Sequence, residues 1–284
     1  MKGIVFSVIL FFISIPLYPQ HTVKKVRLSA ELKEISGLEK FNDSILIAIN
    51  DSGNSPELFF IDLKGEIIKK TFVSNALNID WEDLTIDDEG NLYIADVGNN
   101  AHLRKDLGIL KLNTQEAFTS DSISAEKIYF TYTDQLDFSE NSVAQNHDCE
   151  AVFWFEDSLH LLTKITTKPK KDYWYNGTSD YMLSTNPGMH SVKSNTHYWT
   201  GGDNRLKHQV TACDSHHNDL AILTYGFVYF YQIGSPKVIK REPIKFKRLT
   251  QKEALVYFSD TKIYVAAEKN WLLGGPFLYT IDLK

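Results

Sequence analysis

The sequence predicts an all-β fold, a β-propeller in which five blades are favoured over six. Three observations carry this prediction. Short runs of aromatic and β-branched residues, bounded by Asp, Asn, Gly and Ser, recur from residue 22 to the end with almost no helical pattern between them. The runs group into repeating units of roughly 40 to 50 residues with four strands each, which is typical of propeller blades. The last unit ends one strand short.

Each unit is expected to open on an innermost strand, and these strands align at one position. That position is occupied by Ser36, Glu82, Glu150, Thr211 and Glu253. A turn and a second strand follow at residues 45–49, 92–95, 159–162, 220–223 and 263–266. Third and fourth strands are clearest in the first two units, at 58–62 and 67–73, and at 108–112 and 127–132.

The ring is expected to close through its N-terminal end. After 253–258 and 263–267, the last unit retains only a strand at 277–283. The run at 22–28 has no partner of its own, so it can supply the missing outer strand. Five blades then account for residues 21–284 as a single domain. Six blades are an alternative, because the long third unit between Glu150 and His208 has room for another blade.

The first 20 residues are expected to be a signal peptide. They hold a lone Lys2, an apolar stretch at 4–17 and the polar Tyr18-Pro19-Gln20, with cleavage expected near Gln20. A membrane anchor is the alternative, but the apolar stretch is shorter than the roughly 20 residues that a spanning helix needs. The mature chain is therefore expected to be secreted or periplasmic, not attached to a membrane, and monomeric.

Composition excludes some partners and frameworks. The formal net charge of -6 argues against binding to a phosphate backbone, which usually requires a basic face, so nucleic acid is not an expected partner. Two cysteines are too few for a disulfide-dependent fold. Cys149 and Cys213 both fall in predicted strands, where buried free thiols are favoured over a bridge.

A five-residue signature, Asn-x-Asp-x-Glu, occurs twice. Its copies are Asn78-Ile79-Asp80-Trp81-Glu82 and Asn146-His147-Asp148-Cys149-Glu150. Because strand side chains alternate between faces, Asp80 with Glu82 and Asp148 with Glu150 are expected to point to one side. In a propeller, the loops that enter the innermost strands share a face with the loops that join second and third strands. The signature therefore places paired carboxylates at one mouth of the central channel.

The loops between second and third strands add oxygen ligands at the same mouth. Asp51-Ser52-Gly53-Asn54 and Asp96-Val97-Gly98-Asn99 form another repeat, and the corresponding ends in the other units are Lys164, Tyr225 and Glu268. Crowded carboxylates repel one another unless a cation neutralises them. Oxygen ligands select hard cations, so we expect a Ca²⁺ site. Its expected ligands are Glu82, Glu150, Glu253, Asp80, Asp51 and Asp96. An acidic channel with lysine and water partners, or purely structural carboxylates, are the alternatives.

Catalysis, if present, is expected at the second signature. His147 is the general-base candidate, and Asp148 is its acidic neighbour. The sequence contains no Gly-x-Ser-x-Gly, His-Glu-x-x-His, phosphate-loop or Cys-x-x-Cys motif, so covalent nucleophilic chemistry is not indicated. Tyr173, Trp174 and Tyr175 lie in a long loop of the same face and could stack on a sugar or a peptide.

The stretches 48–54, 80–84 and 90–100, together with 104–107 and 148–151, resemble a group of largely uncharacterised exported bacterial β-propeller proteins. The acidic mouth is more distantly similar to paraoxonase and gluconolactonase-like lactonases, phytase-like propellers and calcium-activated nucleotidases. That resemblance implies calcium at the channel mouth, although the chain lacks the full motifs of those families.

Two functions follow as hypotheses. The first is metal-assisted hydrolysis of an ester, lactone or phosphoester. The second is a non-catalytic propeller with a structural cation, whose mouth binds a small molecule, a glycan or a cell-surface protein.

Overall fold

The computed structural model describes residues 21, 23–139, 146–165, 177–201 and 205–283. The predicted signal peptide at 1–20 and the aromatic residues Tyr173, Trp174 and Tyr175 lie outside the described residues. Within the described part of the chain, no helix is long and apolar enough to cross a membrane.

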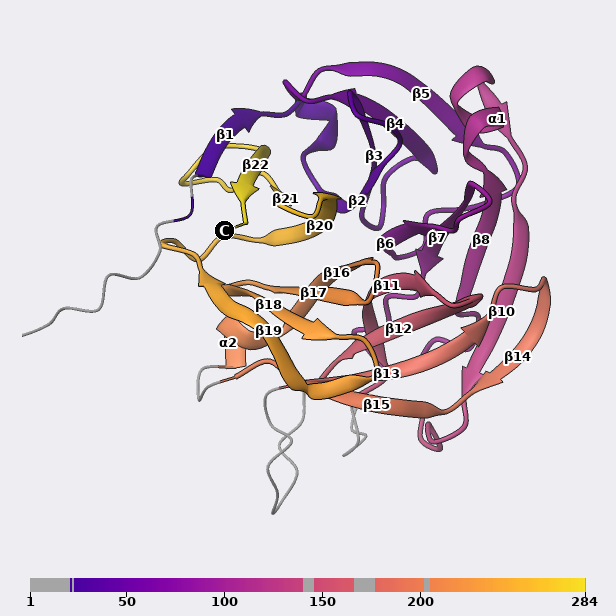
Figure 1. Cartoon of the computed structure of the whole chain (residues 1–284). Coiled ribbons are helices and arrows are strands. Elements are labelled where there is room, and N and C mark those ends of the chain that lie inside the picture. Colours follow the sequence, from indigo (N-terminus) through magenta and orange to yellow (C-terminus); the bar gives the residue numbers. More distant parts are fainter. Residues whose placement is uncertain (1–20, 22, 140–145, 166–176, 202–204, 284) are drawn as a thin grey trace, which may run out of the picture.

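Five sheets of the described chain surround a central channel, and Figure 1 shows them in a view down the axis of the ring. Every innermost strand packs against the innermost strands of both neighbouring sheets, so the ring is closed. The innermost strands are β2 (Ile35–Lys40), β6 (Trp81–Ile86), β11 (Asp148–Phe155), β16 (Val210–His216) and β20 (Lys252–Ser259). This confirms a five-bladed propeller, with blades 1 to 5 numbered in that order.

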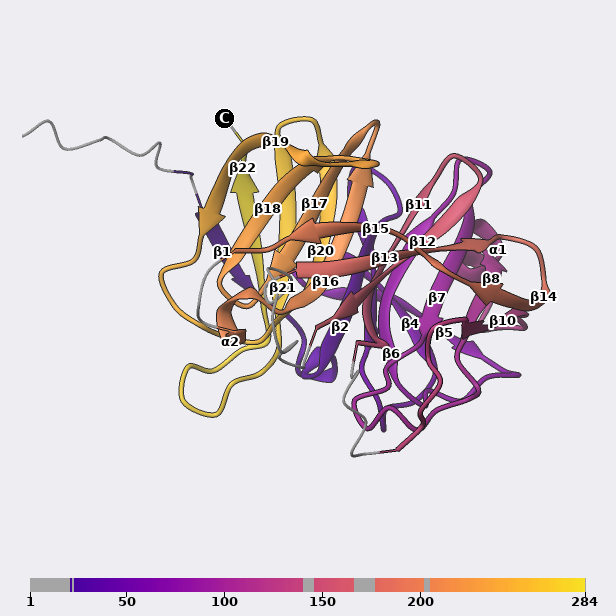
Figure 2. The same ribbon diagram turned by 90° about the horizontal axis from the view of Figure 1, so that it is seen from below.

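The second, third and fourth strands of each blade run antiparallel to their neighbours. The second strands are β3 (Ile45–Asn50), β7 (Asn91–Asp96), β12 (Ser158–Lys164), β17 (Asp219–Thr224) and β21 (Lys262–Ala267). The third strands are β4 (Glu57–Asp62), β8 (Gly108–Asn113), β13 (Gly177–Ser184), β18 (Phe227–Gln232) and β22 (Phe277–Asp282). The fourth strands are β5 (Ile67–Val73), β10 (Glu126–Tyr132), β15 (Ser194–Trp199), β19 (Ser235–Lys245) and β1 (Val23–Arg27). Figure 2 shows these blades with the ring turned by 90°.

The N-terminal strand closes the ring as predicted. β1 pairs antiparallel with β22, placing Val23 opposite Ile281 and Arg27 opposite Phe277. The first described strand of the chain thus becomes the outer strand of the last blade, and closure joins the two ends of the domain.

The length of the third unit has an explanation other than a sixth blade. β14 (Gly188–Val192) leaves blade 3 and pairs in parallel with β10 of blade 2. β9 (Ser122–Ile123) pairs in parallel with β5 of blade 1 in the same manner. These two fifth strands were not predicted, because neither makes a hydrophobic run long enough to stand out. Three short helices complete the described elements: η1 (Ala30–Leu32), α1 (Thr114–Thr119) and α2 (Arg205–His208).

The core lies between the blades, where adjacent sheets pack face to face. Each of the five blade–blade interfaces within the described residues has its own cluster of buried hydrophobic side chains. Cys149 and Cys213 belong to two different clusters, and both are buried free thiols, as the sequence favoured. Trp81 is fully buried between blades 1 and 2, directly beside Asp80 and Glu82.

Each innermost strand has a β-bulge at the same position. The strand register shifts across Ser36, Glu82, Glu150, Thr211 and Glu253. A bulge leaves one residue out of the ladder and changes the direction of its side chain. The five residues that the sequence aligned are therefore equivalent in the structure, and the bulge is the local feature that presents them at the channel.

Candidate functional site

Of the five bulged residues, the two that carry a hydroxyl group form hydrogen bonds between neighbouring blades. Ser36 Oγ donates to the Trp81 carbonyl at 2.7 Å, and Thr211 Oγ1 donates to the Lys252 carbonyl at 2.6 Å. Each bond runs from one innermost strand to the next, whose inner edge has no strand partner. The hydroxyl groups at these two positions therefore stabilise contacts between blades. The candidate site residues among the five are the three glutamates.

Deeper in the channel, buried carboxylates also serve the backbone. Asp83 Oδ2 accepts from the Val152 and Cys213 amides at 3.1 and 3.4 Å, and so joins blade 2 to blades 3 and 4. Asp214 Oδ2 accepts from the Tyr257 amide of blade 5. Burial raises the pKa of both carboxyls, and the amide donors oppose that shift. No sequence motif marks these residues, although the position of Asp214, three residues after a bulge, is shared by Glu39 in blade 1.

A group of three carboxylates forms the candidate cation site. Oxygen atoms of Asp51, Asp80 and Glu82 all lie within 4.8 Å of one another. Asp51 follows β3 in blade 1, whereas Asp80 precedes β6 and Glu82 is its bulged residue, so two blades contribute. Gly98 leaves room for this arrangement, because a Cβ at that position would displace the carboxylate oxygens of Asp80 and Glu82. All three residues are half-buried.

The electrostatics of this group favour a bound cation. Burial, followed by the negative charge of Asp51, raises the pKa of Asp80 to about 6. Burial also raises the pKa of Glu82 well above its ordinary value, and the charges of Glu150 and Asp51 raise it further. Among the described residues, no lysine or arginine forms an ion pair with any of the three. The group thus fits a hard divalent cation, whose oxygen ligands are of this type.

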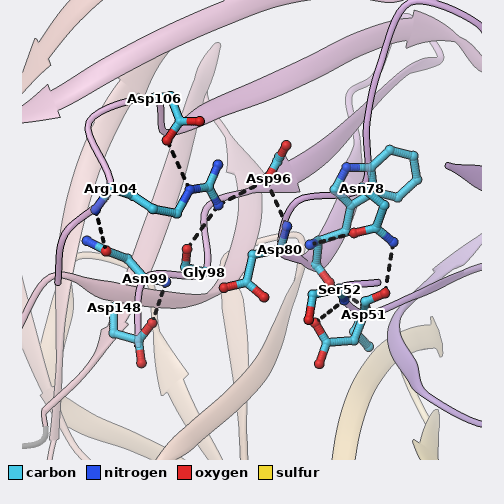
Figure 3. Close-up of polar contacts among 12 residues, drawn as sticks. Asp51, Ser52, Asn78, Asp80, Asp96, Gly98, Asn99, Arg104, Asp106 and Asp148 are labelled. Atoms are coloured by element: carbon cyan, nitrogen blue, oxygen red, sulfur yellow. Dashed lines mark hydrogen bonds and ion pairs between the residues drawn. The ribbon is translucent and has the colours of Figure 1, made fainter. Parts of the chain in front are cut away.

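Asp96 lies outside that group and has a cation of its own. Figure 3 shows Arg104 between Asp96 and Asp106, with Nη1 3.0 Å from Asp96 Oδ1 and Nε 3.1 Å from Asp106 Oδ1. Arg104 also donates to the Gly98 carbonyl at 2.9 Å. Burial raises the pKa of Asp96, and Arg104 opposes the shift.

Strand register explains why the two Asp-x-Gly-Asn loops differ. In blade 1, Asn50 pairs opposite Ile35, and Asp51 comes one residue later. In blade 2, Asp96 itself pairs opposite Trp81, the equivalent of Ile35. The residue equivalent to Asp51 is therefore Val97. Since a shift of one residue reverses the direction of a strand side chain, the repeated sequence does not give a repeated ligand.

The second signature carries its own counter-charge. Lys164 Nζ forms an ion pair with Glu150 and lies 3.8 Å from Asp148 Oδ2. Asp148 also accepts a hydrogen bond from the Asn99 amide at 2.8 Å. Burial alone would lower the pKa of Lys164, but the carboxylates of Glu150 and Asp148 outweigh it and raise that pKa. The two carboxylates thus share one cation supplied by blade 3, although burial still raises the pKa of Glu150 well above its ordinary value.

Glu253 lies on the blade 5 side of the mouth beside Glu268 and Tyr225. Burial, and then the charge of Glu268, raises the pKa of Glu253 to about 8, while a hydrogen bond from Tyr225 opposes the shift. Burial and the charge of Asp51 raise the pKa of Glu268 to about 7. Both carboxyls therefore titrate near neutral pH, the range that suits general acid–base work.

His147 is buried beside the mouth and is held by neighbouring side chains. Its Nε2 lies 3.2 Å from Asp134 Oδ1, and Asp134 Oδ2 accepts a hydrogen bond from Tyr181 at 2.9 Å. The imidazole also packs against the ring of Tyr132. Burial lowers the pKa of His147, and Asp134 opposes that shift. Asp134 and Tyr181 were missed at the sequence level, because only the fold brings them to His147.

One other group of described side chains has metal-binding spacing. His216, His217 and Asp260 lie in turns at the far ends of β16 and β20, on the face away from the acidic mouth. His216 Nε2 lies 2.6 Å from Asp260 Oδ1, so this group already contains an ion pair when the imidazole is protonated.

Comparison with known proteins places the chain by its fold. No protein-family model matches the sequence, and no curated protein matches it. Among solved structures, it is similar to the glutaminyl cyclase of Myxococcus xanthus, with a TM-score of 0.54, 10% identity, and coverage of 93% of this chain and 98% of that chain. It is similar to the PQQ-bound aldose sugar dehydrogenase of Streptomyces coelicolor, with a TM-score of 0.53, 8% identity, and coverage of 93% and 98%.

A streptogramin B lyase has a TM-score of 0.51 and 9% identity, with coverage of 93% of this chain and 98% of that chain. At such low identity these similarities show a shared β-propeller fold. Because the three proteins are named for three different reactions, the fold alone does not assign one.

Proposed function

We propose that the protein is an exported hydrolase that uses a calcium ion at its channel mouth. The observation that carries this proposal is the convergence of Asp51, Asp80 and Glu82, whose oxygens lie within 4.8 Å of one another without a basic ion-pair partner among the described residues. Similar propeller structures include several enzymes, which supports a catalytic use of this scaffold. Export is inferred from the N-terminal 20 residues.

Calcium bound by these carboxylates would polarise a carbonyl or phosphoryl oxygen of the substrate. The protein would supply the proton transfers. Glu268 and Glu253 suit that role, because their pKa values are raised to about 7 and about 8 and both lie at the mouth. His147 and Asp148 fit it less well, because His147 is held against Asp134 and Asp148 lies beside Lys164. The substrate class is an ester, a lactone or a phosphoester.

The test is a panel of p-nitrophenyl esters, lactones and phosphoesters, assayed with calcium and with EDTA. We expect hydrolysis of one class that requires calcium and is lost in Glu82→Gln. Glu268→Gln should lower the rate and remove from the pH profile the limb that reports a titration near pH 7, while retaining calcium binding. A folded protein that binds calcium and hydrolyses none of the panel would contradict the proposal in favour of the alternative, a ligand-binding propeller with a structural cation.

A further inference from the structure

A large groove separates blades 4 and 5 at the end of the ring that carries the acidic mouth. Its volume is about 1280 Å³, and its walls come from β19 and the segment that follows it, from the start of β20, and from β22 and β1. Blades 4 and 5 are neighbours at the left of Figure 1. Lys252, on the innermost strand, and Lys25, on the outermost, both line the groove, so it extends from the channel side to the rim.

The groove is basic although the chain as a whole is acidic. Its lining includes five basic residues, Lys25, Lys245, Lys247, Arg248 and Lys252, against two acidic ones, Glu242 and Glu268. The whole chain has a formal net charge of -6. None of the five forms an ion pair with a described carboxylate, whereas Lys164 and Arg104 at the mouth both do. This local excess of positive charge complements an anionic ligand.

Lys252 is the basic residue at the inner end, and it is only 3% exposed. Its ammonium donates to the Arg248 carbonyl at 3.0 Å and to Thr250 Oγ1 at 2.8 Å, and it lies 4.3 Å from the centre of the Phe246 ring. An ammonium has three N–H donors, so one is left without an acceptor among the described residues. Lys252 has no carboxylate within ion-pair distance among the described residues, so the adjoining Glu253 offsets the cost of burying its charge only in part, and a bound anion would lower that cost further.

Aromatic side chains lie between the two ends. Phe277 and Tyr279 of β22 and Phe246 after β19 line the groove together with Leu273. Lys25 Nζ lies 3.3 Å from the centre of the Phe277 ring, at the outer end. An apolar floor with an ammonium at its buried end matches a ligand that has a hydrocarbon body and a charged head.

We propose that the groove between blades 4 and 5 binds a long-chain carboxylate, with its head group on Lys252 and its hydrocarbon body on Phe246, Phe277 and Tyr279. A single available N–H at the buried end suits a monoanionic head. This inference does not depend on the proposed hydrolase activity.

The test is calorimetric titration with dodecanoate, dodecanol and butanoate in EDTA, so that the calcium site plays no part. We expect dodecanoate to bind at least about 10-fold more tightly than either of the others, because only dodecanoate offers both parts. Lys252→Met should weaken dodecanoate binding about 10- to 100-fold, and Lys252→Arg should retain most of it. Lys111→Met is the matched control, because Lys111 also lies over an aromatic ring, that of Tyr93 in blade 2.

Lys25→Met provides a second variant at an exposed position, and it should weaken binding a few-fold if Lys252→Met does not fold. The proposal is overturned if the wild type does not bind dodecanoate, if dodecanol binds equally well, or if Lys25→Met and every folded Lys252 variant bind like the wild type. Because EDTA is present throughout, a negative result in this titration does not contradict the proposed calcium site. Absence of calcium binding would likewise not contradict the proposed carboxylate groove.

Discussion

Blades 2 and 3 carry the same Asn-x-Asp-x-Glu signature, yet their carboxylates have different electrostatic surroundings. In blade 3, Lys164 forms an ion pair with Glu150 and lies 3.8 Å from Asp148. In blade 2, Asp80 and Glu82 face Asp51, a third carboxylate, and no described basic residue pairs with them. The first arrangement contains a cation of its own, whereas the second contains none among the described residues and is, on our proposal, completed by a cation from solution.

A single position at the end of the second strand accounts for this difference. It directly follows the residue that pairs with the one before the bulge, Asn50 in blade 1 and Thr163 in blade 3. Blade 1 has Asp51 there and directs it toward the signature of blade 2. Blade 3 has Lys164 there and directs it toward its own signature. A repeated carboxylate motif therefore does not define a metal site by itself. The neighbouring loop decides whether the protein supplies a cation to the signature, as Lys164 does, or adds a third carboxylate, as Asp51 does.

Removing the internal cation of blade 3 should have the largest effect on stability. In Lys164→Met, the buried Asp148 and Glu150 lose their counter-charge, and we expect the free energy of unfolding to fall by about 3 to 5 kcal/mol. Urea denaturation measures the loss. The double variant Lys164→Met, Glu150→Gln should recover a large part of it, and a double variant no more stable than the single one would contradict the comparison.

The converse change gives blade 2 an internal cation. Asp51→Lys places an ammonium at the position equivalent to Lys164, next to Glu82. Calcium binding should disappear, and stability in EDTA should rise by about 1 kcal/mol. Asp88→Lys, the same change in an exposed turn, is the control and should leave calcium binding unaltered. Retained calcium affinity in Asp51→Lys would break the distinction between the blades.

The pH dependence of stability should expose the uncompensated carboxylates. The folded protein retains protons on Asp80, Glu268 and Glu253, whose pKa values are raised to about 6, 7 and 8, at pH values where the unfolded chain has released them. In EDTA, the free energy of unfolding should therefore fall as pH rises from about 5 to about 8. Calcium should oppose that fall, because it binds the deprotonated form. Thermal denaturation across this range, with and without calcium, measures both trends.

The smallest effect on stability is expected for the two bulged residues that carry a hydroxyl group, Ser36 and Thr211. Ser36→Ala removes the hydrogen bond to the Trp81 carbonyl, and should cost about 1 kcal/mol without altering calcium affinity. Thr211→Val should behave alike on the other side of the ring. A change in calcium affinity in either variant would show that these positions also belong to the site.

Much of the fold could be predicted from the sequence, because the blade is a local unit with its own pattern of runs and turns. Strand β5 (Ile67–Val73) and the closing role of β1 illustrate this. β9 and β14 could not be predicted, because each is a short strand whose position depends on a partner blade. Of the six expected calcium ligands, the structure groups Asp51, Asp80 and Glu82, and gives Asp96, Glu150 and Glu253 other partners.

The separation of Asp96 from the group of three carboxylates has a specific physical cause. Asp96 follows the same loop sequence as Asp51, but pairs one register position earlier, which no sequence pattern reveals. The counter-ion role of Lys164 depends likewise on a contact made across a strand pair. The sequence therefore located the mouth, while the assignment of each carboxylate required strand register.

Calorimetric titration of the folded wild type, Glu82→Gln and Glu150→Gln with calcium tests the central claim most directly. We expect one calcium site in the wild type, its loss in Glu82→Gln and its retention in Glu150→Gln, because Glu150 lies outside the group of three carboxylates and already has Lys164 as its ion-pair partner. Loss of binding in both variants would contradict the separation between blades 2 and 3. Absence of binding in the wild type would contradict the calcium site itself.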